Sequence, residues 1–539
     1  MPFSLSTAAP RRKPLVACLA VVLGSTAIFA TSSDASAAWQ HKHDFKHPTR
    51  AHAATLAKGH LHQVVPDHHQ ALIAHVHAKF GAAKAKNLQR PSATTAVTSC
   101  LDDGSAGTLR SVIAAANSGD TIDLSGLACS TITLATGAIQ TGLDDLTITG
   151  PGAANLTIDA GGNDRAFLHY GYGTLTINKV TIANGYYKYG GGNYAAGGCI
   201  LTVGSVALND SVVTGCYAGG AYASEGGGIY SVGTAALTRS TVSNSVVYGI
   251  AYYGHTDSAG GGVWSRGAMT LIDSTITGNA AYGFAVNQTN YNFIRGGGVY
   301  GIGGTTITRS TIDTNYAVYS GGGISSLYGT TISNSTVANN YSYAGVGGGV
   351  FTLYDAVSIG NSTIAGNYSY HSGGGAYTVL GPLDLQSTII ASNTSGDTSN
   401  ADFGYYVYNG VSAPTGANNL IISSAFTVPS GTLTADPQLQ PLGNNGGLTQ
   451  TMALLAGSPA IDQGNNLAGL ATDQRGTGFA RVGGASADIG AFELQVAAGE
   501  QKIPAPTLSV WAQWLLAGAL GLLGMGGFLR RRHPSHESS

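Results

Sequence analysis

Charged side chains are scarce in this sequence. Lys and Arg number 25 and Asp and Glu number 27 among 539 residues, so 10% of the chain is charged and the formal net charge is −2. So small a net charge gives no global attraction for nucleic acid or for an anionic membrane surface, and we expect no nucleic-acid partner. An electrostatic partner would need a local patch.

Cysteine is also rare. There are five cysteines, and no two of them have the Cys-x-x-Cys spacing of a structural zinc site, which argues against a zinc module. What the chain has instead is glycine and tyrosine, with 79 and 27 residues. This is not the composition of an ordinary helical enzyme.

The N-terminus has the layout of a secretory signal. Basic residues at 11–13 precede an apolar run over 14–29, and the small-residue motif Ala-Ser-Ala follows at 35–37. We expect cleavage after Ala37 and export of the mature chain. Export leaves four cysteines in an oxidising compartment, where they predict two disulfides. Of the three pairings, Cys100–Cys129 with Cys199–Cys216 is the simplest.

The C-terminal end has the features of a membrane anchor. Residues 508–529 are apolar and glycine-rich, and three arginines follow at 530–532. About 20 such residues span a bilayer, and a basic cluster favours the cytoplasmic side. We expect a transmembrane helix here, with the chain before Leu508 facing outward.

Glycine pairs recur at intervals that indicate a solenoid. The repeats begin at Gly197, Gly226, Gly260, Gly296, Gly321, Gly347 and Gly373, with spacings of 29, 34, 36, 25, 26 and 26 residues. Periods of this length are typical of stacked structural repeats.

Three aliphatic columns keep a common register inside the repeats. The first lies three residues after each start, at Ile200, Ile229, Val263, Val299, Ile324, Val350 and Ala376. A serine recurs further on, at Ser211, Ser240, Ser274, Ser310, Ser335, Ser362 and Ser387. The second column precedes that serine by three residues, except in the last repeat, where Asp384 stands there beside Leu385. The third column follows the serine by two residues and ends at Ile389. Runs such as TTITRSTI alternate with period two, so each repeat is interpreted as three short strands that stack in parallel.

A polar column accompanies the aliphatic ones. Five residues after the serine come Cys216, Ser245, Asn279, Asn315, Asn340 and Asn367, with Asn393 displaced by one. Asparagines stacked at coil spacing predict a ladder of side-chain hydrogen bonds. The paired glycines suit bends where backbones approach closely or φ is positive.

The segments between the asparagine column and the next glycine pair vary in length, and all are expected to project from one edge. Tyrosine gathers there, at Tyr248, Tyr252, Tyr253, Tyr282, Tyr291, Tyr316, Tyr319, Tyr341, Tyr343, Tyr368 and Tyr370. A tyrosine offers a flat apolar face and a hydroxyl at little entropic cost, which favours binding of a glycan or a surface protein. The alternative is that the rings pack on each other and shield the edge.

The segment CLDDGSAGTLRSVIAAANSGDTIDLSGLACSTITL, followed by GPGAANLTID, resembles the entry of bacterial right-handed parallel β-helix surface proteins. Leu109, Val112, Ile113 and Ala116 are spaced as one face of a short helix, which predicts a cap over the first coil. The Gly-Gly-x-Ile repeats also resemble those of polymorphic outer-membrane proteins.

Two further resemblances lie downstream. DPQLQPLGNNGGLTQTMALLAGSPAIDQGNN, TDQRG and DIGAFE are similar to the choice-of-anchor Q domain that follows such helices. The tail IPAPTLSVWAQWLLAGALGLLGMGGFLRRR resembles the IPTL-CTERM sorting signal, with an Ala-Pro insertion after Ile503-Pro504. That resemblance implies an exosortase-like membrane peptidase as partner, and Pro506, Thr507, Leu508 and Trp511 as sorting residues. The alternative is a plain membrane anchor.

Ten of the fifteen histidines lie within residues 38–96, which have few large apolar residues and are predicted to be a disordered linker. Clustered imidazoles bind zinc, copper or nickel, so this is the one predicted cofactor site. Its candidate ligands are His60, His62, His68, His69, His75 and His77. The alternative is a pH-dependent polycation.

No catalytic residue is predicted. A glycoside hydrolase needs two carboxyl groups close together, and a lyase needs a base beside a cation. The acids of the repeats are sparse, and in this register no two of them in neighbouring coils share a column: Asp210, Glu225, Asp257, Asp273, Asp313, Asp355 and Asp384. Arg266, Arg295 and Arg309 are single cations.

The sequence therefore predicts an all-β chain whose right-handed parallel β-helix has three strands per coil, an N-terminal helical cap and a C-terminal transmembrane helix. Its expected regions are a signal peptide over 1–37, a His-rich linker over 38–96, the β-helix over 97–430, a choice-of-anchor Q-like region over 431–496 and a sorting tail over 497–539. The expected function is non-catalytic adhesion or glycan binding at the cell surface. A polysaccharide lyase or hydrolase and a structural envelope protein are the alternatives.

Overall fold

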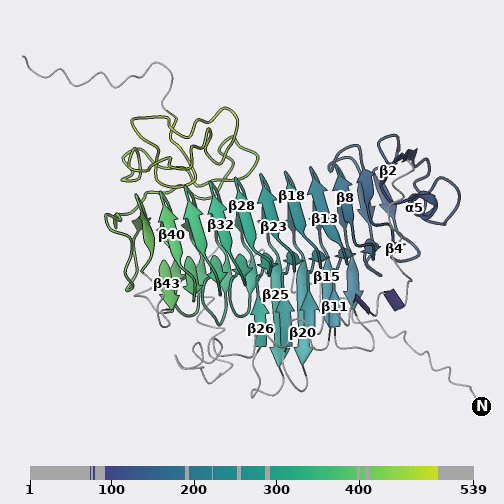
Figure 1. The fold of residues 1–539 in the computed structure, drawn as a ribbon, viewed down its shortest axis with the longest axis horizontal. Coiled ribbons are helices and arrows are strands. Elements are labelled where there is room, and N and C mark those ends of the chain that lie inside the picture. The colour runs from purple at the N-terminus through teal and green to yellow at the C-terminus, as the bar shows by residue number, and fades with distance from the viewer. Residues whose placement is uncertain are drawn as a thin grey trace, which may run out of the picture. The chain divides into compact units, whose positions relative to one another are not determined.

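The computed structural model describes residues 73–74, 77–78, 91–188, 194–220, 223–251, 256–285, 292–396, 401–406 and 413–495. These residues form a parallel β-solenoid of the right-handed type with about 10 turns. Strands of one sheet pair with their counterparts one coil away, so the sheets run along the stack of coils (Figure 1). The predicted signal peptide, sorting tail and transmembrane helix lie outside the described residues, as does nearly all of the His-rich linker. Within the described part, no helix is long and apolar enough to span a bilayer.

Five sheets make up the solenoid, and three of them run nearly its whole length. Sheet 1 consists of β1 (Thr94–Ala96), β2 (Asp120–Asp123), β5 (Leu146–Thr149), β8 (Thr174–Asn178), β13 (Ser205–Asn209), β18 (Ala235–Thr238), β23 (Met269–Ile272), β28 (Thr305–Thr308), β32 (Thr330–Ser333), β36 (Val357–Gly360), β40 (Leu383–Gln386) and β44 (Thr415–Ala417). Sheet 2 consists of β3 (Thr131–Thr133), β6 (Thr157–Asp159), β9 (Thr181–Ala183), β14 (Val212–Thr214), β19 (Thr241–Ser243), β24 (Thr275–Thr277), β29 (Thr311–Asp313), β33 (Thr336–Ala338), β37 (Thr363–Ala365), β41 (Ile389–Ala391) and β45 (Leu420–Ile421). Sheet 3 consists of β4 (Ile139–Thr141), β7 (Phe167–His169), β12 (Ile200–Thr202), β17 (Ile229–Ser231), β22 (Val263–Ser265), β27 (Val299–Gly301), β31 (Ile324–Ser326), β35 (Val350–Thr352), β39 (Ala376–Val379) and β43 (Phe403–Tyr406).

Two further sheets correct the prediction of three strands per coil. Sheet 4 consists of β10 (Tyr186–Lys188), β15 (Tyr217–Gly220), β20 (Val246–Ala251), β25 (Ala280–Ala285), β30 (Tyr316–Ala317), β34 (Tyr341–Ser342), β38 (Tyr368–Ser369) and β42 (Thr394–Ser395). Sheet 5 consists of β11 (Tyr194–Ala196), β16 (Ala223–Glu225), β21 (Thr256–Ala259) and β26 (Asn292–Arg295). The variable segments thus lie on one edge, as predicted, but they are strands rather than loops. Sheets 4 and 5 share a thin core of Ala195, Ala218, Val247, Ala281 and Ile294.

The three aliphatic columns fill the interior, as the sequence predicts. Members of all three from Ile200 to Ile364 are at most 1% exposed and belong to one continuous cluster. The last repeat departs from the predicted register, because Ile364 pairs with Ile390 and not with Ile389. Thr388 then occupies the serine position and hydrogen-bonds to the carbonyl of Ile359 at 3.1 Å. Ser387 instead adopts the left-handed conformation, with φ 48°.

The asparagine ladder is present. Each Nδ2 donates to Oδ1 of the next member at 2.9–3.0 Å, through Asn279, Asn315, Asn340, Asn367 and Asn393. A second ladder, of serines, is one that the sequence reading missed. The backbone N–H of each serine from Ser211 to Ser335 donates to Oγ of the next at 3.0–3.2 Å. Both columns lie at bends, where their side chains hydrogen-bond to backbone groups that have no partner in the sheets.

The paired glycines have two separate roles. The first of each pair has a positive φ, as Gly321 does at 65° and Gly347 at 65°. At the second, a Cβ would collide with backbone: at Gly348 it would lie 2.1 Å from the carbonyl oxygen of Tyr368. Any side chain at these positions would therefore strain the bend or push the coils apart.

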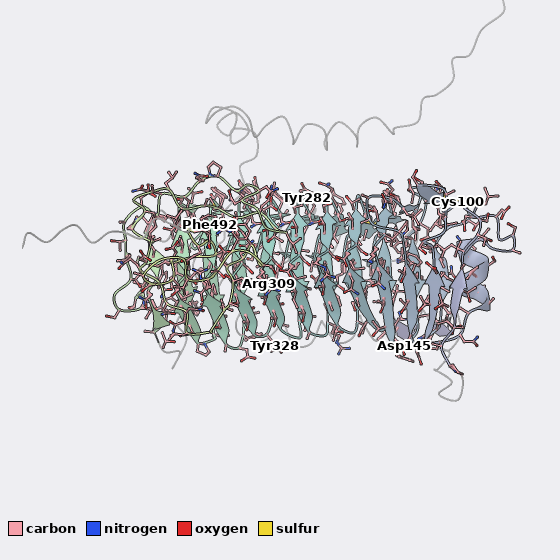
Figure 2. All side chains as sticks on the ribbon, turned by 90° about the horizontal axis from the view of Figure 1, so that it is seen from above. Cys100, Asp145, Tyr282, Arg309, Tyr328 and Phe492 are labelled. Atoms are coloured by element: carbon pink, nitrogen blue, oxygen red, sulfur yellow. A yellow bond between two sulfur atoms is a disulfide. The ribbon has the colours of Figure 1, made fainter. Side chains whose placement is uncertain are left out.

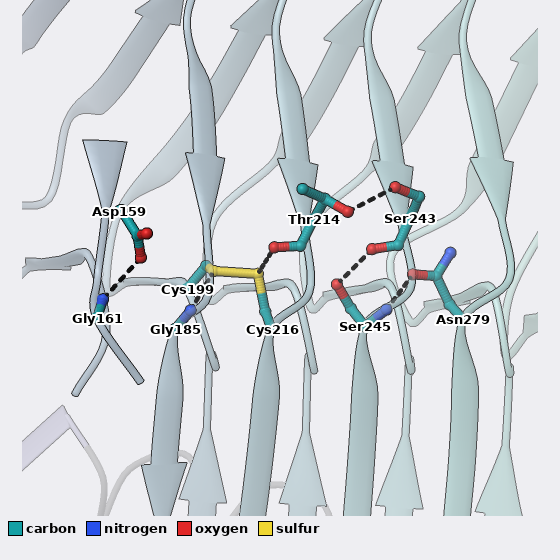
Figure 3. The surroundings of a disulfide bond; sticks show 9 residues. All are labelled: Asp159, Gly161, Gly185, Cys199, Thr214, Cys216, Ser243, Ser245 and Asn279. Carbon is teal, nitrogen blue, oxygen red and sulfur yellow. Dashed lines mark hydrogen bonds between the residues drawn. A yellow bond between two sulfur atoms is a disulfide. The ribbon is translucent and has the colours of Figure 1, made fainter. Parts of the chain in front are cut away.

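Both predicted disulfides are formed, Cys100–Cys129 and Cys199–Cys216. Cys216 lies at the head of the asparagine column, next to Ser245, whose backbone N–H donates to Oδ1 of Asn279 at 3.0 Å (Figure 3). The disulfide thus joins sheet 3 to the bend where the ladder begins.

A short helix, α5 (Leu109–Ala115), forms where the sequence predicts one, and Thr108 caps its N-terminus. Leu109, Val112 and Ile113 are buried in the solenoid core. Arg110, on the helix, donates to both carboxylate oxygens of Asp102 at 2.8 and 2.9 Å.

Candidate functional site

Tyrosines line the outer face of sheet 4. The register places Tyr186 beside Tyr217 at one end and Tyr316, Tyr341 and Tyr368 beside each other at the other end. Their neighbours in sequence, such as Ala317, Ser342 and Ser369, are buried on the opposite side of the strands. The alternation of a strand therefore presents every tyrosine of this column on the same face.

The rings form a continuous stack along the coils. The centroids of Tyr282 and Tyr316 lie 4.9 Å apart, those of Tyr316 and Tyr341 5.6 Å, and those of Tyr341 and Tyr368 4.5 Å. The last two pairs are nearly parallel, with interplanar angles of 6° and 12°. Burial is the main cause that raises the pKa of Tyr316, Tyr341 and Tyr368 above that of free tyrosine.

A second row lies two residues further along the strands and is open to solvent. Tyr282 belongs to this row, and its ring also contacts the end of the stack at Tyr316. Tyr282, Tyr343 and Tyr370 are 38%, 38% and 36% exposed. The sheet edge thus combines a partly buried stack, as the shielding interpretation predicts, with exposed rings, as the binding interpretation predicts.

The other predicted tyrosines have different places. Tyr248 lies in β20, partly buried, in register with Tyr282. Tyr319 packs against the core between sheets 4 and 5 rather than joining the stack. Tyr252, Tyr253 and Tyr291 lie outside the described residues. A pair that the prediction left out, Tyr328 and Tyr354, stacks at 5.8 Å on another edge, and Figure 2 shows Tyr282 and Tyr328 on opposite sides.

A second candidate site is the corner between sheets 3 and 5. Glu225 of β16 and Asp257 of β21 come from neighbouring coils: Glu225 pairs with Ala259, and Asp257 lies two positions before Ala259, on the same face of the sheet. Arg295 lies two coils from Glu225 in the same column. Tyr194 donates its hydroxyl to Oε2 of Glu225. The sequence reading treated these two carboxyl groups and Arg295 as isolated, and in this respect it was incomplete.

Burial dominates the electrostatics of this corner. Glu225 is 6% exposed, and its pKa is raised well above the usual value, first by burial and then by the charge of Asp257. Burial also raises the pKa of Tyr300 to about 12, against the opposing effect of the positive charge of Arg295. A raised pKa favours the protonated form of a carboxyl group, which is the form that can donate a proton.

Aromatic side chains continue from this corner along the outer face of sheet 3. Tyr230 and Trp264 pair in register and stack at 4.4 Å with 12° between their planes, and Tyr300 follows in the next coil. Tyr230 and Trp264 are fully buried.

Two other acids of the repeats, Asp210 and Asp273, are held in ion pairs. Arg239 donates to both oxygens of Asp210 at 2.6 and 2.8 Å, and Arg309 to both oxygens of Asp273 at 2.7 and 2.9 Å. The charges of these residues alternate in sign from coil to coil along one bend of the solenoid. We therefore interpret them as structural ion pairs between coils.

The motifs TDQRG and DIGAFE come together in the buried polar centre of residues 431–495. The guanidinium of Arg475 binds Oδ2 of Asp473 at 2.6 Å and lies 3.9 Å from the ring centroids of both Phe479 and Phe492. Arg481 contacts Glu493 at 3.3 Å, with both side chains fully buried.

The same region docks on the side of the solenoid. Gln474 accepts a hydrogen bond from the hydroxyl of Thr336 at 2.6 Å and donates to the carbonyl of Ser310 at 3.3 Å. Ala453, Leu454, Ile489 and Phe492 pack with Ile389 of sheet 2. The motif residues therefore hold this segment together and fix it to sheet 2.

No metal-binding group of three or more His, Cys, Asp or Glu side chains occurs among the described residues. His77 is the one predicted ligand that the described part includes. Its Nε2 lies 2.9 Å from the carbonyl oxygen of Tyr170, and its Nδ1 lies 3.1 Å from the hydroxyl of Tyr172. The other candidate histidines lie outside the described residues, so metal binding stays a prediction.

The ladders of the chain itself define its class, a parallel β-solenoid. No family model matches the sequence, and no curated protein matches it. Among solved structures it is similar to the crystal structure of pectate lyase Pel9A, with a TM-score of 0.33 and 13% identity over 75% of this chain and 97% of that one. At that level of likeness no residue or activity is carried over.

Proposed function

We propose that this protein is an exported, surface-sorted β-solenoid that presents the tyrosine face of sheet 4 for adhesion, as a non-catalytic binding surface for a glycan or a surface protein. The observation that carries the proposal is the exposed row of Tyr282, Tyr343 and Tyr370 beside the stack of Tyr316, Tyr341 and Tyr368. Stacked rings form a rigid platform, and exposed tyrosines bind partners at little entropic cost.

Three sequence features support export and sorting in this proposal. The N-terminal signal layout directs the chain out of the cytoplasm, and two disulfides in the solenoid suit an oxidising compartment. The tail with Pro506, Thr507, Leu508 and Trp511 then serves an exosortase-like peptidase, and its apolar helix holds the protein in the membrane until sorting. The repeats and the 431–496 region fit the polymorphic outer-membrane and choice-of-anchor Q resemblances in this proposal.

Glycan-array binding by the purified protein tests the binding surface. We expect a triple variant with Tyr282, Tyr343 and Tyr370 changed to Ala to lose its array signal. The matched control changes Tyr328 and Tyr354 to Ala, because this stacked pair lies on another edge. Equal binding by the two variants, or no bound glycan and no bound surface protein, would leave a structural envelope role as the better explanation.

The corner between sheets 3 and 5 favours a second candidate, a polysaccharide lyase or hydrolase. Glu225 is a carboxyl group with a raised pKa beside Asp257, and Arg295 supplies a cation for an acidic sugar. Release of unsaturated or reducing sugars from acidic polysaccharides, abolished by Glu225→Gln, would support this candidate. Absence of release under conditions where the glycan array gives a signal would eliminate it.

A further inference from the structure

Tyr341 and Tyr368 have the shortest distance between ring centroids in the stack. They pair directly in the ladder of sheet 4, so their rings leave neighbouring strands from equivalent positions. Their centroids are 4.5 Å apart and the planes differ by 12°. The two rings therefore face each other at stacking distance.

Access does not prevent a reaction at this pair. Both residues are partly buried, and the adjacent Tyr343 and Tyr370 are exposed. No cysteine lies between residues 217 and 539 to compete for an oxidant nearby. A phenol with this exposure can give an electron to an oxidant in solution.

We propose that Tyr341 and Tyr368 are an oxidative crosslinking site, which a peroxidase acting with hydrogen peroxide converts to dityrosine. Each phenol loses one electron and one proton, and the peroxide is reduced to two waters. The two phenoxyl radicals form one carbon–carbon bond between the ring positions next to the hydroxyls. The hydrogen on each of those carbons then moves to its oxygen, which restores two phenols. The product has lost two hydrogen atoms and joins adjacent coils.

Geometry selects this pair over its neighbours in the stack. Tyr316 lies 5.6 Å from Tyr341, and the ring of Tyr282 is tilted by 34° against that of Tyr316. Tyr186 and Tyr217, at 4.8 Å and 11°, have comparable geometry and react by the same route.

The test is oxidation of the full-length protein with a haem peroxidase and hydrogen peroxide, followed by mass spectrometry. No Lys or Arg lies between 310 and 474, so trypsin leaves both tyrosines on one peptide. A protease that cuts before Asp313, Asp355 and Asp384 separates them. We expect the peptides 313–354 and 355–383 to appear joined, with two hydrogen atoms missing and the crosslink at Tyr341 and Tyr368.

Phenylalanine variants make the assignment specific. Tyr341→Phe and Tyr368→Phe keep the stacked ring but cannot form a phenoxyl radical, so each is expected to abolish the joined peptide. Tyr343→Phe and Tyr370→Phe are the matched controls and are expected to retain it. The proposal is overturned if the controls lose the crosslink, if the crosslink persists in Tyr368→Phe, or if oxidation joins only separate molecules on a denaturing gel. It is also overturned if free N-acetyltyrosine amide is coupled under conditions that leave the protein unjoined.

Discussion

The side-chain amide of Asn393 donates to Oδ1 of Asp402 at 3.0 Å, so the asparagine ladder ends on a carboxylate. The backbone N–H of Asn393 donates to the same oxygen at 2.8 Å, and that of Ser423 donates to Oδ2 at 2.9 Å. Asp402 is 2% exposed. The carboxylate of Asp402 therefore accepts hydrogen bonds both from the last asparagine of the ladder and from the backbone at Ser423.

Replacing Asp402 by Ala removes the acceptor of the backbone N–H and side-chain amide of Asn393 and the carboxylate acceptor of the Ser423 N–H. Each buried orphan costs about 1–3 kcal/mol, so we expect the last coils to open more readily. Hydrogen exchange of peptides within 389–421 measures this opening. Asp402→Asn retains one acceptor oxygen and is expected to have the smaller effect. Equal exchange in the wild type and in Asp402→Ala would show that this end of the ladder contributes nothing.

The sequence predicts the solenoid well where one residue type recurs at a fixed position. This holds for the aliphatic columns, the ladder from Asn279 to Asn393 and both cysteine pairs. In each case the residues must keep a fixed spacing in the sequence for the coils to stack. The left-handed bends before the serines are harder to foresee, since Asp210, Arg239 and Asn334 adopt φ values of 50°, 47° and 53° there without sharing a residue type.

Sheets 4 and 5 were missed for a physical reason. Their shared core uses small residues such as Ala195, Ala218 and Ala281, which give no strong apolar alternation in the sequence. Glu225, Ala259 and Arg295 share one column, and each lies one residue before a glycine pair, so the spacing from the glycines does encode this register. Asp257 lies two positions earlier in its strand, so a search for acids that share a column does not find its proximity to Glu225. Gln474 acts through docking on sheet 2, a contact across more than a hundred residues of sequence.

Gly348→Ala tests the close approach of neighbouring coils. The new Cβ would lie 2.1 Å from the carbonyl oxygen of Tyr368, which only a shift of backbone can relieve. We expect a loss of more than about 1 kcal/mol in the free energy of unfolding, measured by chemical denaturation. The control is Gly360→Ala in β36, where the nearest atom to the new Cβ is 3.9 Å away. That change is expected to be neutral or stabilising, and a similar loss in both variants would contradict the steric explanation.

The tyrosine stack predicts the response of the protein to alkali. Burial raises the pKa of Tyr316, Tyr341 and Tyr368 in the folded state, so the folded chain keeps protons that the unfolded chain releases above its own tyrosine pKa of about 10. The stabilisation is complete below that pH and is lost as the pH rises further.

Tyrosinate absorbance during an alkaline titration measures this effect. We expect a group of phenols that ionises late, at the pH where the protein unfolds. Circular dichroism monitors the unfolding. Tyr341→Phe should remove one phenol from the late group. Ionisation of all tyrosines in one early step would mean that the stack is open to solvent.

Arg475 tests whether the TDQRG motif is structural. Its side chain is 5% exposed, pairs with the fully buried Asp473 and lies between two phenylalanine rings. Removing one partner of a buried ion pair costs about 3–5 kcal/mol, because the remaining charge stays buried without compensation. Arg475→Ala should therefore release residues 431–495 from sheet 2. Arg475→Lys should rescue little, since an ammonium cannot bind Asp473 through two nitrogens and stack on both rings.

Limited proteolysis within 431–495 is the readout, with a fragment containing the solenoid coils expected to survive. Arg239→Ala is the matched control, because Arg239 also pairs with an aspartate but its side chain is 45% exposed. Such a surface ion pair contributes less than about 1 kcal/mol to stability. Rapid cleavage in Arg475→Ala but not in Arg239→Ala would assign the motif to docking. If both variants resisted the protease like the wild type, the cluster around Arg475 would have to serve some purpose other than holding this segment on the solenoid.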